Sequence, residues 1–190
     1  MASILKVNEI TDISGNTMPY MKGAILQTIV HQEDGATSFT ASSTSDKLLL
    51  ASGAADSTSH LSVNITPRST SSKILLSTNI FFEGSADAHS YLFSFYRNNT
   101  KLAAPVASSR RSGIMGTAHG YFNSDISSTA DQTHYKYYDS PNTTSEITYA
   151  VSFQHSNANA ILYLNRTVDD QNSAGYERGM SILIAQEIGG

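Results

Sequence analysis

The side chains that could carry acid–base or metal chemistry are few and scattered. The densest group is His31-Gln32-Glu33-Asp34, which ends an apolar segment just before Gly35, where a polar hairpin turn is expected. The chain has six histidines, and no two have the helical spacing of a metal-binding motif: His31, His60, His89, His119, His134 and His155. In a trimer, one histidine beside the threefold axis would become three and could hold an axial ion. We expect no resident metal from sequence alone.

The carboxylates and possible nucleophiles likewise show no pattern of a catalytic site. Asp169 and Asp170 lie beside Asn172, but these residues supply too few oxygen ligands for a calcium site. A glycosidase needs two carboxylates across a cleft, and no pair among the 16 acidic residues is marked by its spacing. There is no cysteine, no phosphate-binding glycine loop and no nucleophile elbow. We therefore predict a protein that is not an enzyme and has no cofactor.

Tyrosines near loops rich in Asp, Asn, Gln and His suggest a binding role. Tyrosine rings stack on sugar faces while nearby amides bond the hydroxyls, and tyrosine is also enriched where proteins meet. The loops 135–142 and 155–159, with 169–176 behind them, are the predicted contact region for a glycan or another protein. The alternative for each of these tyrosines is a strand-edge or interface role. The candidate contact residues are Tyr135, Tyr137, Tyr138, Asp139, Asn142, Asn157 and Tyr176.

Composition limits the partners. Net charge is −4, so no basic field is available to neutralise phosphates, and nucleic-acid binding is not expected. Arg110-Arg111 is the only dense basic pair, and we expect it on a solvated loop. No apolar run approaches about 18 residues, so no membrane insertion is expected. The N-terminus lacks the apolar run of a signal peptide.

The elements that must position these residues are strands. Ser, Thr and Asn make up 59 of 190 residues, and they favour turns and strand surfaces over helix interiors. Leu61, Val63 and Ile65 alternate with polar residues, as do Met180, Ile182 and Ile184. Further strands are predicted over 24–30, 73–82, 90–96, 135–138, 147–153 and 161–164, with turns at 97–100 and 139–145. Leu48-Leu49-Leu50 suits a buried strand or one helical turn. We predict eight to ten strands in an all-β antiparallel sandwich of jelly-roll type.

Residues 1–24 differ from the rest. Ile4 to Ile10 could form a short strand, followed by a turn at Asp12–Asn16. A lone strand is not stable without a partner. We predict that 1–24 is an attachment or oligomerisation segment, using Leu5, Val7 and Ile10, and that 25–190 is the head. The alternative is a frayed tail.

Four motifs, taken in order, resemble those of structural proteins of tailed phages, cyanophages among them. They are Met1–Ile10 with Ser14-Gly15-Asn16, Ile65–Leu76, Tyr138–Thr144 with Ile147-Thr148-Tyr149, and the ending Met180–Gly190. The resemblance implies a homotrimer whose sandwich head is similar to TNF/C1q-like knobs. It also implies an N-terminal segment that binds other tail or capsid proteins.

The expected function is therefore a virion tail-fibre or receptor-binding protein, made in the host cytoplasm. One departure from the pattern is that no coiled coil, collagen-like repeat or β-helix encodes a shaft. That favours a short tail-tip protein, or the alternative of a capsid decoration or tail adaptor protein. A small polysaccharide-degrading enzyme and a cellular TNF/C1q-like ligand are the further alternatives.

Overall fold

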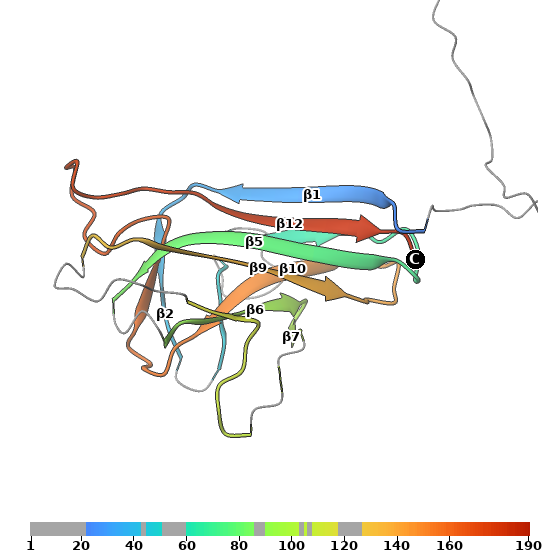
Figure 1. The fold of residues 1–190 in the computed structure, drawn as a ribbon, viewed down its shortest axis with the longest axis horizontal. Helices are drawn as coiled ribbons and strands as arrows, with labels where there is room; N and C mark the ends of the chain where they lie inside the picture. The colour runs from blue at the N-terminus through green and yellow to red at the C-terminus, as the bar shows by residue number, and fades with distance from the viewer. Residues whose placement is uncertain are drawn as a thin grey trace, which may run out of the picture.

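The computed structural model describes residues 22–42, 45–50, 60–85, 90–102, 105, 108–117 and 127–190. Within them the chain forms an all-β sandwich, as predicted, and every paired strand is antiparallel (Figure 1). The strands are β1 (Ile25–Glu33), β2 (Thr37–Thr40), β3 (Lys47–Leu48), β4 (Ser62–Ile65), β5 (Lys73–Gly84), β6 (Leu92–Arg97), β7 (Thr100–Lys101), β8 (Met115–Gly116), β9 (Asp131–Asp139), β10 (Ile147–Gln154), β11 (Ile161–Leu164) and β12 (Ser181–Ile188).

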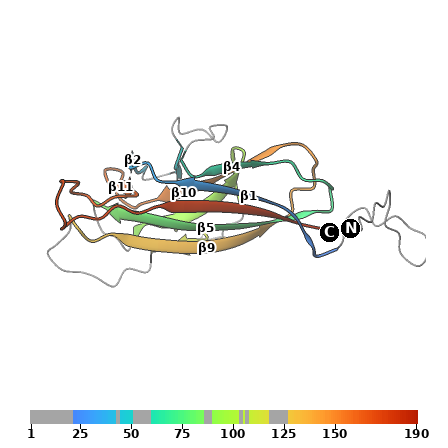
Figure 2. The ribbon, with the colours of Figure 1, turned by 90° about the horizontal axis from the view of Figure 1, so that it is seen from above.

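Two sheets make the sandwich. The first has the order β1-β12-β5-β9, and β11 with β2 continues beside the end of β5. The second has β10 at its centre, paired with β6 on one side and with β3 and β4 on the other. The chain changes sheet between β2 and β3, β4 and β5, β5 and β6, β8 and β9, β9 and β10, and β10 and β11. This repeated crossing is typical of a jelly roll (Figure 2).

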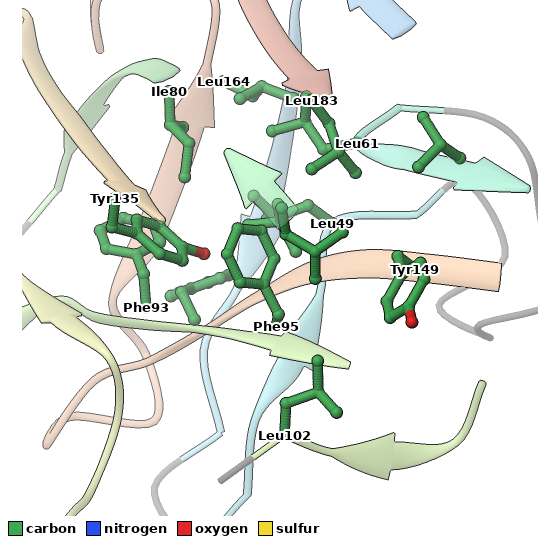
Figure 3. Close-up of a cluster of buried hydrophobic side chains, with 14 of the residues drawn as sticks. Leu49, Leu61, Ile80, Phe93, Phe95, Leu102, Tyr135, Tyr149, Leu164 and Leu183 are labelled. Atoms are coloured by element: carbon green, nitrogen blue, oxygen red, sulfur yellow. The ribbon is translucent and has the colours of Figure 1, made fainter. Parts of the chain in front are cut away.

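The core lies between the inner faces of the sheets and is rich in aromatic rings. Phe82 packs edge-on against Phe93 at a centroid distance of 5.3 Å, and Phe95 lies 4.5 Å from Tyr135. Leu49, Leu61 and other aliphatic side chains fill the space around them (Figure 3). The period-two alternation of the strands explains this packing, because every second side chain points inward.

The sandwich has two distinct ends. At the first, which we call the terminal end, the Gly23 amide donates to the Gly189 carbonyl at 2.7 Å, so both ends of the described chain meet. The 140–146 turn lies here too, because the end of β9 pairs with the start of β5. The opposite or far end carries the loops 155–160 and 165–180, which adjoin the end of β5 and the start of β12 (Figures 1 and 2).

Most predicted strands are confirmed, with shifted limits. The predicted strand at 135–138 is β9, which begins four residues earlier, and β12 extends four residues beyond Ile184. Leu48 belongs to a strand and not to a helical turn. β2, β7 and β8 were not predicted, and the described residues form twelve strands where eight to ten were expected. The Asn98 turn between β6 and β7 has a φ of +50°, the left-handed conformation that asparagine tolerates. The predicted strand Ile4–Ile10, including Leu5, Val7 and Ile10, lies outside the described residues.

Candidate functional site

The outer face of the first sheet is the most distinctive surface in the described part of the chain. Side chains directly opposite on paired strands share a face, so the registers define its outward positions. One row runs from Val30 through Ile184 and Ser77 to Lys136, and the next runs from Thr28 through Gln186 and Leu75 to Tyr138. We call this surface the β1-β12-β5-β9 face.

Large apolar side chains are exposed on this face, between polar ones such as Thr28, Gln186 and Ser77. Of the described residues, four large hydrophobic side chains are strongly exposed: Ile25 (58%), Val30 (51%), Tyr138 (55%) and Met180 (51%). The first three occupy outward positions on the face, and Met180 directly precedes β12. Ile182, Ile184, Ile188 and Leu75 add half-buried apolar surface between them. Several exposed apolar side chains gathered on one sheet face are typical of a site of interaction with another molecule.

Charge on the face is sparse and of one sign. Lys73, His134 and Lys136 occupy outward positions along β5 and β9, and no outward position of the four strands holds Asp or Glu. The β1 and β12 side is the most apolar part, and the β9 side is more polar. A partner would therefore bury the β1 and β12 side and leave the basic residues at the rim, the usual arrangement of protein interfaces.

The second sheet has a different outer face. β10 presents Thr148, Ala150 and Ser152 outward, because its other residues fill the core. Ala150 and Ser152 are nevertheless buried, and Leu50 packs on Ala150. Within the described residues, these small and polar side chains leave no comparable group of exposed apolar side chains there. The asymmetry between the sheets indicates that the β1-β12-β5-β9 face has a role beyond folding.

The prediction of a surface contact is wrong for Tyr135 and Asp139, because both side chains point into the sandwich. Tyr135 is only 4% exposed, stacks near Phe95 and donates its hydroxyl to the Ser94 carbonyl at 3.0 Å. Asp139 is 6% exposed; it accepts a hydrogen bond from the Tyr149 hydroxyl at 2.6 Å and pairs with Arg97 at 3.1 Å. Both residues stabilise the fold and are not available to a receptor.

The other predicted contact residues lie apart. Tyr137 is half-buried against the core, whereas Tyr138 faces outward beside Leu75 on the β1-β12-β5-β9 face. Asn142 is exposed in the turn at the terminal end, while Asn157 is exposed at the far end. Tyr176 is half-buried in the 165–180 loop, also at the far end. The structure therefore divides the predicted contact region between the two ends and one sheet face.

The polar clusters flagged by sequence make ordinary structural contacts. Glu33 accepts from the Gly35 amide and lies 3.2 Å from His60 Nδ1 and 3.7 Å from His31 Nε2. Asp170 forms a two-point ion pair with Arg178. No group of three or more His, Asp or Glu side chains suited to a metal ion occurs within the described residues. Nor does any helix there have the length and apolarity to cross a membrane.

A buried carboxylate that sequence reasoning missed holds the far end together. Glu83 is almost fully buried and accepts hydrogen bonds from the amide and hydroxyl of Thr129 and from the amide of Val168. It thereby joins the start of β9 to the 165–180 loop. Glu83 follows the core residue Phe82 and therefore has outward parity on β5, so its burial comes from the segments that cover it. The alternation in the sequence gives no signal for this carboxylate.

Buried tyrosines are the groups whose ionisation the fold changes most. Burial, and then the hydrogen bond to Asp139, raises the pKa of Tyr149 well above its usual value. Burial, and then the charge of Asp46, likewise raises the pKa of Tyr135. Burial and the hydrogen bond to Asp46 raise the pKa of Tyr96. All three therefore act as neutral hydrogen-bonding groups of the core and its margins.

Fold and surface together define the class of the protein as a jelly-roll sandwich that exposes several large apolar side chains on one outer sheet face. No family model matches the chain, and no curated protein matches it. One similar solved structure is described as "Structure of infectious bursal disease virus Gx strain". The alignment has 12% identity and a TM-score of 0.32, and covers 98% of this chain but 42% of that one. A likeness this distant carries no argument about function.

Proposed function

We propose that this chain is a structural component of a phage virion, a tail-fibre or receptor-binding protein that acts by assembly and binding. The observation that carries the proposal is the apolar β1-β12-β5-β9 face, which a lone sandwich would leave in water. The sequence resemblance to tailed-phage structural proteins supports the virion assignment. The same resemblance implies three copies. The exposed apolar side chains of the β1-β12-β5-β9 face support self-association.

The arrangement of the two ends supports a division of labour. The N-terminal segment is proposed to bind other virion proteins, and the described chain starts at the terminal end. The far end then points away from the virion, with the loops 155–160 and 165–180 towards the host glycan or protein. The turn at 140–146 is assigned instead to the virion side.

A binding role in place of a catalytic one is supported by how the carboxylates are used. Glu83, Asp139 and Glu187 are buried, and each is engaged by protein hydrogen-bond donors. A glycosidase would instead need two carboxylates facing a substrate across a cleft.

The test of self-association is native mass by light scattering. The expected value is three times 20.5 kDa. Ile184→Lys, combined with Val30→Lys, places two charges at adjacent positions of the face and should give a folded monomer. Thr100→Lys, at an exposed position on the other sheet, is the matched control and should remain trimeric. A wild-type monomer, or a trimer in the double variant, would overturn the proposed assembly face.

Location on the particle tests the virion assignment separately. Immunogold labelling of intact phage should place the protein at the tail tip. Labelling over the capsid would favour the decoration alternative and reject the tail-fibre assignment. Absence from the particle would reject both.

A further inference from the structure

A hollow of about 500 Å³ opens beside the start of β6. Its walls include the hydroxyl-bearing residues Ser90 and Ser109, the apolar Leu92, Gly116 and two arginines, Arg110 and Arg111. The wall is therefore a mixture of apolar surface, hydroxyls and guanidinium groups. The volume lies within the usual range of small-molecule sites. The wall is more polar than in most such sites, which suits a hydrophilic ligand.

Arg111 is held at the wall of the hollow. Its Nη1 donates to the carbonyl of Ser90 at 2.6 Å, a contact between two residues that both line the space. Within the described residues, Arg111 has no ion pair with a carboxylate. A guanidinium has five N–H donors in a rigid fork, so one anchoring bond leaves a face able to hold an anion.

The loop that carries Arg111 is fixed on its C-terminal side. The Ser112 carbonyl accepts from Lys101 Nζ at 2.7 Å, and the Ile114 amide donates to the Phe93 carbonyl at 2.8 Å. Gly113 lies so close to β6 that an added Cβ would be 2.6 Å from Leu92 Cγ. These contacts preorganise the arginine before a ligand binds, so that less conformational entropy is lost on binding.

The position of the hollow favours a ligand from the host side. β6 runs from the far end, where Leu92 pairs with Gln154, to the terminal end, where Arg97 meets Asp139. The hollow at the start of β6 therefore opens near the end that faces away from the virion in the proposed function. A concave site of this size can hold one or two sugar rings. A contact with another protein would need a much larger surface.

From this geometry we infer that the hollow beside Arg111 binds an acidic saccharide, with the guanidinium holding its carboxylate or sulfate group. Ser90 and Ser109 supply hydroxyls for the sugar. The inference deepens the proposed function, on which it rests, and assigns receptor contact to a region outside the loops that sequence analysis selected.

The test measures saccharide binding by isothermal titration calorimetry with the full chain. A hyaluronan tetrasaccharide provides the carboxylate, a sulfated dextran oligosaccharide provides the sulfate, and an unmodified dextran oligosaccharide is the neutral comparison. We expect one of the acidic probes to bind and the neutral one not to bind. Which acidic probe binds identifies the anion.

Two variants examine the site from different directions. Arg111→Gln removes the guanidinium and should weaken binding at least tenfold. Gly116→Val adds a side chain where a Cβ meets nothing nearer than the Tyr91 carbonyl at 4.0 Å, so it should occupy the hollow without unfolding the protein. Arg68→Gln, which removes an equal charge from an exposed arginine at the terminal end, is the control and should bind normally.

Binding that is equal in wild type and Arg111→Gln, or absent for both acidic probes, would overturn the inference. Loss of binding in Arg68→Gln to the same extent would do so too, because general charge would then explain the affinity. The native mass and the location on the particle are independent of these measurements. A trimeric virion protein that fails to bind either probe would refute the acidic-saccharide site and leave the proposed function standing.

Discussion

Raising the pH above 10 should destabilise this protein in part because two core tyrosines stay protonated in the fold. Tyr135 and Tyr149 are buried, and their pKa values are raised in the folded state. Tyrosine in an unfolded chain has a pKa of about 10. Each residue therefore stabilises the fold fully below pH 10. That contribution decreases above pH 10, because the unfolded chain releases a proton that the folded chain retains.

The magnitude follows from proton linkage. A group that stays protonated in the fold loses about 1.4 kcal/mol of its contribution between pH 9 and pH 11 when its unfolded pKa is about 10. Tyr149→Phe should therefore reduce the pH-dependent loss of stability by about 1.4 kcal/mol. At neutral pH the same substitution removes a donor from buried Asp139 and should cost about 1–3 kcal/mol. Tyr135→Phe should show the same reduction between pH 9 and pH 11.

The assay is urea unfolding followed by far-ultraviolet circular dichroism, at pH 9 and pH 11 and one fixed protein concentration. Phe93→Leu is the matched control, because it alters core packing beside Tyr135 without changing a titratable group. It should lose as much stability between the two pH values as the wild type does. If Tyr149→Phe also loses as much as the wild type, the ring is not a neutral buried donor and the description of the Asp139 cluster is wrong.

Two further predictions concern packing and the far end. Gly84→Ala should cost about 1–3 kcal/mol in the free energy of unfolding, because a Cβ there would lie 2.4 Å from the Tyr91 ring. Gly175→Ala, where a Cβ would meet nothing within 4 Å, should change it by less than about 0.5 kcal/mol, and an equal loss in both variants would contradict the packing argument. Glu83→Gln should destabilise the protein by about 2–3 kcal/mol and speed proteolysis within 165–180, since charge-assisted hydrogen bonds are lost. Unchanged cleavage there would mean that Glu83 does not hold the loop.

Sequence reasoning located strands best where apolar alternation was strong. Leu61, Val63 and Ile65 mark β4, and the Asn98 turn was predicted correctly. The first half of β9 was missed because Asp131 to His134 are polar. They are strand because they pair with the end of β5, a tertiary contact that local pattern does not encode.

The candidate contact residues failed for a related reason. Alternation along β9 places Lys136 on the outside, and residues of the opposite parity must then point inward. That rule predicts burial of Tyr135, and it also predicts burial of Asp139, which a carboxylate normally resists. Asp139 can be buried because Arg97 and Tyr149 of the other sheet donate to its carboxylate. The spacing of residues along β9 does not predict these partners.

The hollow beside Arg111 could not be predicted from the sequence either, because residues far apart in the chain form it. The sequence marks Arg110-Arg111 only as a basic pair on a loop. The site depends on Ser90, which is 21 residues earlier, and on β8 pairing with β6. Its position relative to the termini depends in turn on the direction of β6 in the sandwich. If the apolar face joins the copies and the terminal end joins the virion, the far end is the surface left for the host. The acidic-saccharide site can then be tested without knowing the receptor.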